Sequence, residues 1–145
     1  MKRILYKIGF ITVISLISYS SYGQCKDFVK KKGVPQLSPY IFNGQMNSAL
    51  LNEGDMAELI FTFYANQEYR IVVCSEEHLG KVDWKLYDVQ NNLLFESKKQ
   101  NQVQLWDFSS TATQQIRLEL EVQEGLNPLK SKNGCVAILI GFKDK

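Results

Sequence analysis

The segment QIRLELEV, residues 115–122, decides the fold because its apolar and polar side chains alternate without a break. One side of the segment is apolar and consists of Ile116, Leu118, Leu120 and Val122. The other side carries Arg117, Glu119 and Glu121. A period of two is typical of a β-strand with one face in a core and one face in water. The segment therefore predicts a strand of an antiparallel sheet.

The same alternation recurs along most of the chain. Clear examples are Ala57–Tyr64, Glu68–Ser75 and Val82–Val89, and shorter candidates are Gln45–Leu51, Leu93–Glu96 and Val103–Phe108. The last segment, Cys135–Phe142, is apolar on both faces, which predicts a central strand or one covered on both sides. Residues 40–145 are therefore predicted to form an all-β, antiparallel, two-sheet β-sandwich, jelly-roll-like, of seven to eight strands. Residues 24–39 contain Pro35 and Pro39 and are predicted to be a loosely structured arm.

The N-terminus has the three-part pattern of a secretory signal peptide. Three cations, Lys2, Arg3 and Lys7, precede an apolar run over residues 8–17, and small residues follow it. We expect residues 1–23 to be removed by cleavage after Gly23, which predicts a periplasmic or secreted protein. Cys25 is not expected to carry a lipid, because the bulky Gln24 stands where lipoprotein leaders have a small residue.

Loss of the leader also changes the charge balance. The mature chain keeps 14 basic and 15 acidic side chains, a net charge of −1. No basic field remains that favours nucleic acid. After removal of the leader, no membrane insertion is expected either.

Four segments together resemble the bacterial pre-peptidase C-terminal type of β-sandwich. They are GDMAELIFTFYANQEYRIVV (54–73), VDWKLYDVQNNLLFES (82–97), QQIRLELEV (114–122) and GCVAILIGF (134–142). The step Leu86-Tyr87-Asp88 matches a strand motif of that family, whereas Asn66-Gln67 and Asn91-Asn92 depart from its Gly-Gln and Asp-Gly turns. The chain is more similar still to short, stand-alone exported bacterial proteins of unassigned activity. The resemblance implies a non-catalytic accessory domain that binds or stabilises.

Three cysteines remain after processing, Cys25, Cys74 and Cys135. An oxidising compartment favours one bridge, which leaves one thiol. The prediction is a Cys74–Cys135 bridge, because strands fix the directions of both side chains. Two alternatives stay open at this point: Cys25 pairs with either strand cysteine, or all three thiols are free.

The sequence offers little catalytic chemistry. His78 is the sole histidine, and it lies in the turn-like segment EEHLG without a nucleophile motif nearby. One histidine and two neighbouring glutamates do not make a zinc site, so no metal and no cofactor are predicted. The chain is not expected to be an enzyme. A small periplasmic hydrolase that uses His78 is kept as an alternative.

Aromatic side chains supply the remaining candidate sites. Trp84 shares a face with Val82 and Leu86 and is assigned to the core. Tyr87 and Trp106 are candidate ligand-binding residues, because exposed aromatic rings stack on sugars or anchor proteins. The leading hypothesis is an exported, non-catalytic binding or accessory module for a protein or glycan of the cell envelope. A carbohydrate-binding module is the second hypothesis.

Overall fold

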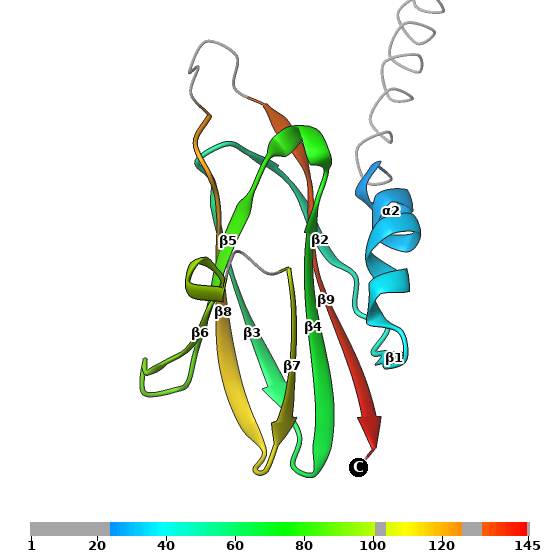
Figure 1. The fold of residues 1–145 in the computed structure, drawn as a ribbon, viewed down its shortest axis with the longest axis vertical. Helices are drawn as coiled ribbons and strands as arrows, with labels where there is room; N and C mark the ends of the chain where they lie inside the picture. Colours follow the sequence, from blue (N-terminus) through cyan, green and yellow to red (C-terminus); the bar gives the residue numbers. More distant parts are fainter. Residues whose placement is uncertain (1–23, 101–103, 126–131, 145) are drawn as a thin grey trace, which may run out of the picture.

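The computed structural model describes residues 24–100, 104–125 and 132–144, and the predicted leader lies outside these residues. Two antiparallel sheets face one another (Figure 1). Sheet A consists of β1 (Ile41–Phe42), β2 (Asn47–Asn52), β9 (Asn133–Asp144), β4 (Gln67–Ser75) and β7 (Leu105–Ser110). Sheet B consists of β3 (Met56–Phe63), β8 (Gln114–Val122), β5 (Val82–Tyr87) and β6 (Leu93–Glu96). The predicted all-β sandwich is confirmed.

Every predicted strand segment has a counterpart among these nine strands. The additional one is the two-residue β1, which is too short to show an alternation. Both β1 and β2 pair with the same edge of β9, and residues 43–46 interrupt them. Asn43 N still donates to Ile140 O at 3.0 Å, and Gly44 allows the break because its φ is +86°. The first strand of sheet A is therefore a kinked continuation of β2.

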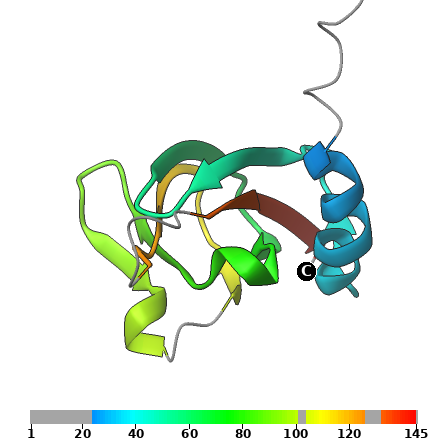
Figure 2. The same cartoon turned by 90° about the horizontal axis from the view of Figure 1, so that it is seen from above.

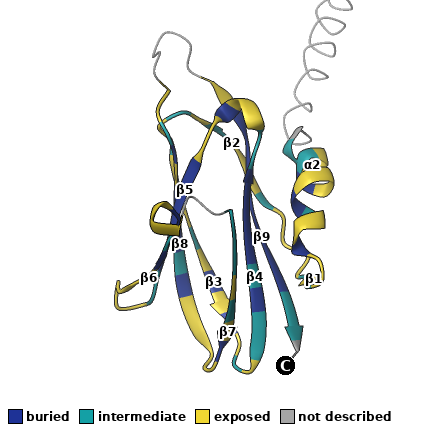
Figure 3. Ribbon diagram, viewed as in Figure 1, coloured by how far each residue is buried: buried dark blue, intermediate teal, exposed yellow. Residues whose placement is uncertain are grey.

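The core lies between the sheets and is built from the predicted alternate positions. Its largest fully buried side chain is Trp84, as expected from its place on β5. In Figure 3 the buried residues concentrate along β4, β5 and β9. Trp106 and Phe108 point into this core from β7, whereas Leu105 packs on the opposite face of sheet A. Both faces of β7 are therefore used in packing.

The N-terminal segment differs from the prediction of a loosely structured arm. Residues 24–37 form consecutive helical turns: α2 (Gln24–Phe28), a π-helical turn (Val29–Gly33) and a 3-10 turn (Val34–Leu37). They cover the outer face of sheet A, as Figures 1 and 2 show from two directions. Val29 and Leu37 are buried there against Val72 and Leu139. This cover explains why Cys135–Phe142 is apolar on both faces, as the sequence pattern predicted.

The predicted Cys74–Cys135 bridge is wrong, because Cys25 bonds to Cys135 instead. In the β4–β9 register Cys74 faces Ala137, so Cys135 is its diagonal neighbour. Diagonal residues are about 7–8 Å apart, beyond the usual Cα separation of bridged cysteines. The helical turns bring the Cα atoms of Cys25 and Cys135 to 5.3 Å. Cys74 stays a buried thiol, and burial raises its pKa to about 11.

Candidate binding surfaces

The hairpin loop between β5 and β6 projects from the body of the sandwich (Figure 1). We call residues 88–92 the β5–β6 tip. The Asp88 carboxylate organises it: Oδ1 accepts hydrogen bonds from the backbone N–H groups of Gln90 and Asn92, both at 2.8 Å. Oδ2 accepts a third bond from Asn92 Nδ2, also at 2.8 Å. These bonds lower the pKa of Asp88, with the Asn92 side chain as the largest cause.

A second set of contacts holds the tip against sheet B. Asn91 adopts a left-handed backbone with φ of 62°, and its Oδ1 accepts a hydrogen bond from Arg117 Nη2 at 2.9 Å. The Arg117 guanidinium lies 4.6 Å from the centre of the Tyr87 ring and also pairs with Glu58 and Glu119. The turn is thus fixed both by its own carboxylate and by a cation on β8.

Most polar side chains of the tip are engaged in these bonds, so the side chain that it presents is apolar. Val89 is 73% exposed, the highest value among the large hydrophobic residues that the structure describes. Leu93 and Leu94 follow on β6 and are exposed as well. An aliphatic group on a projecting loop whose backbone is held by hydrogen bonds suits a concave apolar pocket in another protein.

The two predicted ligand-binding aromatic residues lie apart from each other. Tyr87 is half-buried beneath Arg117. Trp106 stacks on Phe108 with ring centres 5.0 Å apart, and it also contacts Phe95 at 4.9 Å. Trp106 nevertheless reaches a hollow of about 250 Å³ between β6 and β7, next to Leu94. Their role in ligand binding stays a prediction, and the structure assigns both rings packing partners.

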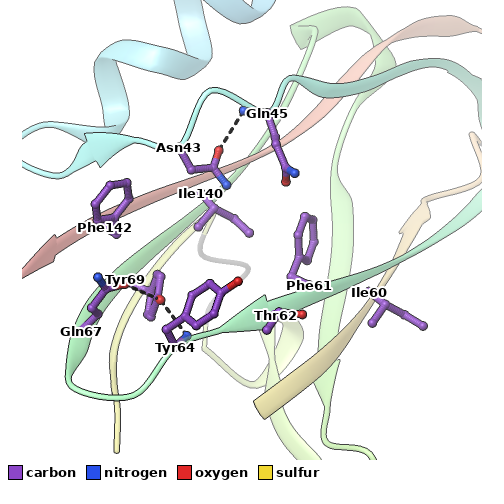
Figure 4. A pocket seen from close by; sticks show the side chains of 10 residues that line it. All are labelled: Asn43, Gln45, Ile60, Phe61, Thr62, Tyr64, Gln67, Tyr69, Ile140 and Phe142. Carbon is purple, nitrogen blue, oxygen red and sulfur yellow. Dashed lines mark hydrogen bonds between the residues drawn. The ribbon is translucent and has the colours of Figure 1, made fainter. Parts of the chain in front are cut away.

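A groove runs along the side of the sandwich where the edges of β2 and β3 face each other. One part of it, about 600 Å³, is drawn in Figure 4: Phe61 and Ile140 line it from the two sheets, and Asn43 and Gln45 stand at its rim. A second part, about 330 Å³, has a mainly apolar lining that includes Leu59 and Ile138. Each part is lined by residues of both sheets, so the sandwich is open on this side.

His78 lines a pocket of about 630 Å³ with Ser75, Glu76 and Glu77, and its ring is hydrogen-bonded to the backbone. His78 lies in the 3-10 turn Glu77–Leu79, and its Nε2 is 2.6 Å from the backbone oxygen of Asn133. The neighbouring carboxylate of Glu76 accepts a hydrogen bond from Cys135 N at 2.8 Å. Within the described ranges, no three His, Cys, Asp or Glu side chains are grouped so that they hold a metal ion. Both side chains fasten the start of β9.

Sequence reasoning overlooked the β5–β6 tip and the groove. Asp88, Asn91 and Asn92 are ordinary turn formers, so the sequence identifies a turn without showing that its polar groups satisfy one another. The available signal was Val89, an apolar residue placed directly before Gln-Asn-Asn in a turn. The groove depends on strand order, which alternation does not reveal.

Comparison with known proteins supports the fold of the chain but identifies no family and no ligand. No family model and no curated protein matches the sequence. The structure is similar to the crystal structure of PliG from Aeromonas hydrophila, a periplasmic inhibitor of g-type lysozyme. The TM-score is 0.50 at 5% sequence identity, and the match covers 72% of this chain and 89% of PliG. The resemblance to the pre-peptidase family stays a prediction.

No helix among the described residues has both the length and the apolar character needed to cross a bilayer.

Proposed function

We propose that this protein is an exported, non-catalytic binding module, and that a folded protein of the cell envelope docks on its β5–β6 tip. The observation that carries the proposal is the combination of a fixed loop backbone with an exposed Val89. A loop that is already ordered loses little conformational entropy on binding. Much of the free energy gained by burying Val89 is then available for affinity.

Export is supported by the covalent chemistry of the mature N-terminus. The Cys25–Cys135 bridge begins two residues after the predicted cleavage site at Gly23. Such structural bridges persist in oxidising compartments and are rare in the cytosol of mesophiles. The likeness to a periplasmic protein of the same fold supports the same location. The accessory role implied by the pre-peptidase resemblance is compatible with it.

A more specific candidate is inhibition of a wall-degrading enzyme. PliG is an inhibitor of g-type lysozyme, and it shares the sandwich fold. The convex tip with Val89 favours this candidate, because enzymes of this kind bind substrate in a cleft. Adding the mature chain to g-type lysozyme and following the lysis of bacterial cell walls tests it. Lower lysis with the native chain supports inhibition, and unchanged lysis at high molar excess contradicts this candidate.

The two alternatives from the sequence receive less support from the side-chain contacts. A carbohydrate-binding module needs open aromatic faces, and Tyr87 and Trp106 are largely covered by Arg117 and Phe108. A glycan array with the Trp106→Ala variant tests that alternative. A hydrolase that uses His78 needs a nucleophile or activated water beside the ring, whereas Nε2 of the ring is hydrogen-bonded to the backbone oxygen of Asn133.

The experiment for the main proposal is an affinity capture from the native envelope fraction, with the mature chain as bait. The Val89→Asp variant places a charge where we expect an apolar contact, so it should lose the captured protein. Leu50→Asp is the matched control, because Leu50 is an exposed apolar residue of β2 in the other sheet. Retention of the same protein by Val89→Asp, or its equal loss in both variants, contradicts docking at the tip.

A further inference from the structure

Strand β3 leaves one backbone edge without a partner strand in the described part of the chain. It is the terminal strand of sheet B, and its other side pairs with β8 over eight residues without a bulge. Val122 N donates to Asp55 O at 2.9 Å, which fixes the alternation of this ladder. Residues 57, 59, 61 and 63 therefore direct their backbone groups to β8, and residues 58, 60 and 62 direct theirs outward.

This edge lacks the features that normally prevent strands from pairing between molecules. Proteins protect such edges with lysine, proline, bulges or very short strands. The segment MAELIFTF contains neither lysine nor proline, and its one charge, Glu58, is paired with Arg117 at 3.2 Å. Met56 and Ile60 are exposed on its outer face, with Tyr64 directly after the strand. An unprotected apolar edge of this length is suited to strand addition.

We propose that the β3 edge pairs with the β3 edge of a second copy of this chain, antiparallel and around a two-fold axis at Ile60. In this register Ile60 lies opposite the partner subunit's Ile60, and the two exchange both backbone hydrogen bonds. Sheet B then continues across the axis as one eight-stranded sheet, because it has four strands in each chain. The interface is isologous, as in most homodimers.

Charge and side-chain matching favour a second copy as the occupant. In the proposed register Glu58 lies opposite the partner subunit's Thr62, so no like charges meet. On the inner face Leu59 lies opposite the partner subunit's Phe61, which adds an apolar cross-strand pair. A register centred on Glu58 would instead place two carboxylates opposite each other and is disfavoured. The sequence of β3 is therefore compatible with pairing to itself in the register centred on Ile60.

The groove described above lies along the same side of the sandwich. Its larger part is lined by Ile60 and Thr62 of β3 and by Tyr64. A second β3 beside this edge would reduce the exposure of all three residues. Dimer formation would therefore remove exposed apolar surface of Ile60 and Tyr64 from water, which favours association.

Sedimentation equilibrium of the mature chain, from low micromolar to millimolar concentration, tests the proposal. We expect a reversible dimer whose dissociation constant rises by roughly tenfold or more in Ile60→Lys, because two like charges then meet at the axis. Leu50→Lys, a change at a similarly exposed residue of β2 (51% against 61% for Ile60), should leave the dimer intact. A monomer at all concentrations, or equal dimerisation of Ile60→Lys and the native chain, overturns the proposal.

Oxidative cross-linking tests the register itself. The Ile60→Cys variant should form a disulfide-linked dimer, because directly opposite residues of a hydrogen-bonded pair have Cα atoms about 5.5 Å apart. Met56→Cys is the control: the two introduced thiols would be roughly 27 Å apart at about 3.4 Å per residue. Equal cross-linking of both variants contradicts the register. Neither measurement involves the β5–β6 tip. A negative result for the dimer therefore leaves the proposed docking function untouched, and the reverse also holds.

Discussion

Cys25 is bonded to Cys135, so helix α2 is joined to strand β9 across 110 residues. The bridge lies on the outer face of sheet A and ties the helical segment to the strand that it covers. It closes nearly the whole described chain into one loop. This relationship makes the N-terminal segment part of the fold rather than an appendage.

The bridge should contribute strongly to stability. In the chain-entropy model, a cross-link that closes a loop of this length stabilises the native state by about 5 kcal/mol. We expect Cys25→Ser to lower the free energy of unfolding, measured by urea denaturation, by roughly that amount. Cys74→Ser, which leaves the bridge intact, is the control. Equal stability of Cys25→Ser and the native chain would show that the bridge does not form.

The remaining thiol should be unreactive while the protein is folded. Cys74 is buried beneath the helical turns, and burial raises its pKa to about 11, so the thiolate is scarce at neutral pH. Treatment with an alkylating reagent followed by mass spectrometry should show no label in the native protein. In denaturant without reductant, one label per chain should appear on Cys74. Rapid native labelling would mean that the helical segment does not cover sheet A.

Acid should loosen the β5–β6 tip. Hydrogen bonds, mainly from Asn92, hold the pKa of Asp88 below its usual value. A carboxylate with a lowered pKa in the folded state stabilises that state above its unfolded pKa, and the effect disappears as pH falls through the folded value. NMR titration should therefore find the Asp88 midpoint below that of an unstructured aspartate. The Asn92 amide should lose protection from exchange at the same midpoint, and an ordinary pKa for Asp88 would contradict the loop geometry.

The close approach of the helical segment to sheet A should make Gly33 intolerant of a side chain. A Cβ atom at Gly33 would lie 2.5 Å from Leu139 Cδ1 and 3.0 Å from Cys74 Sγ. Overpacking of this kind typically costs about 1–3 kcal/mol, which offsets the better helix propensity of alanine, about 1 kcal/mol. We expect Gly33→Ala to lower the thermal midpoint, and Gly33→Val to lower it further. A higher midpoint in both variants would contradict the observed packing.

The sandwich was predictable because side-chain alternation reports burial directly. Segments such as 115–122 keep one face apolar over their whole length, and this pattern marks a strand whatever its neighbours are. The two-sided apolar character of β9 even indicated a cover on the outer face of sheet A. The prediction did not identify what provides that cover.

The helical segment was not predictable for a physical reason. Val29 and Leu37 are buried, but Lys30, Lys31 and Lys32 lie between them, and each helical turn is too short to show a period. Its stability comes from packing on sheet A and from the bridge rather than from local propensity. The bridge was missed for a related reason, because its geometry depends on the β4–β9 register and on the position of that segment.

The central claim is that the β5–β6 tip is the docking site for a protein partner. Its most direct test is to place a photo-cross-linking amino acid at position 89. The full chain that carries this residue is then expressed in the organism from which it comes and irradiated there. The account predicts a discrete protein adduct at position 89 and none when the same group replaces Leu50. Absence of an adduct at position 89, or the same adduct from both positions, would contradict it.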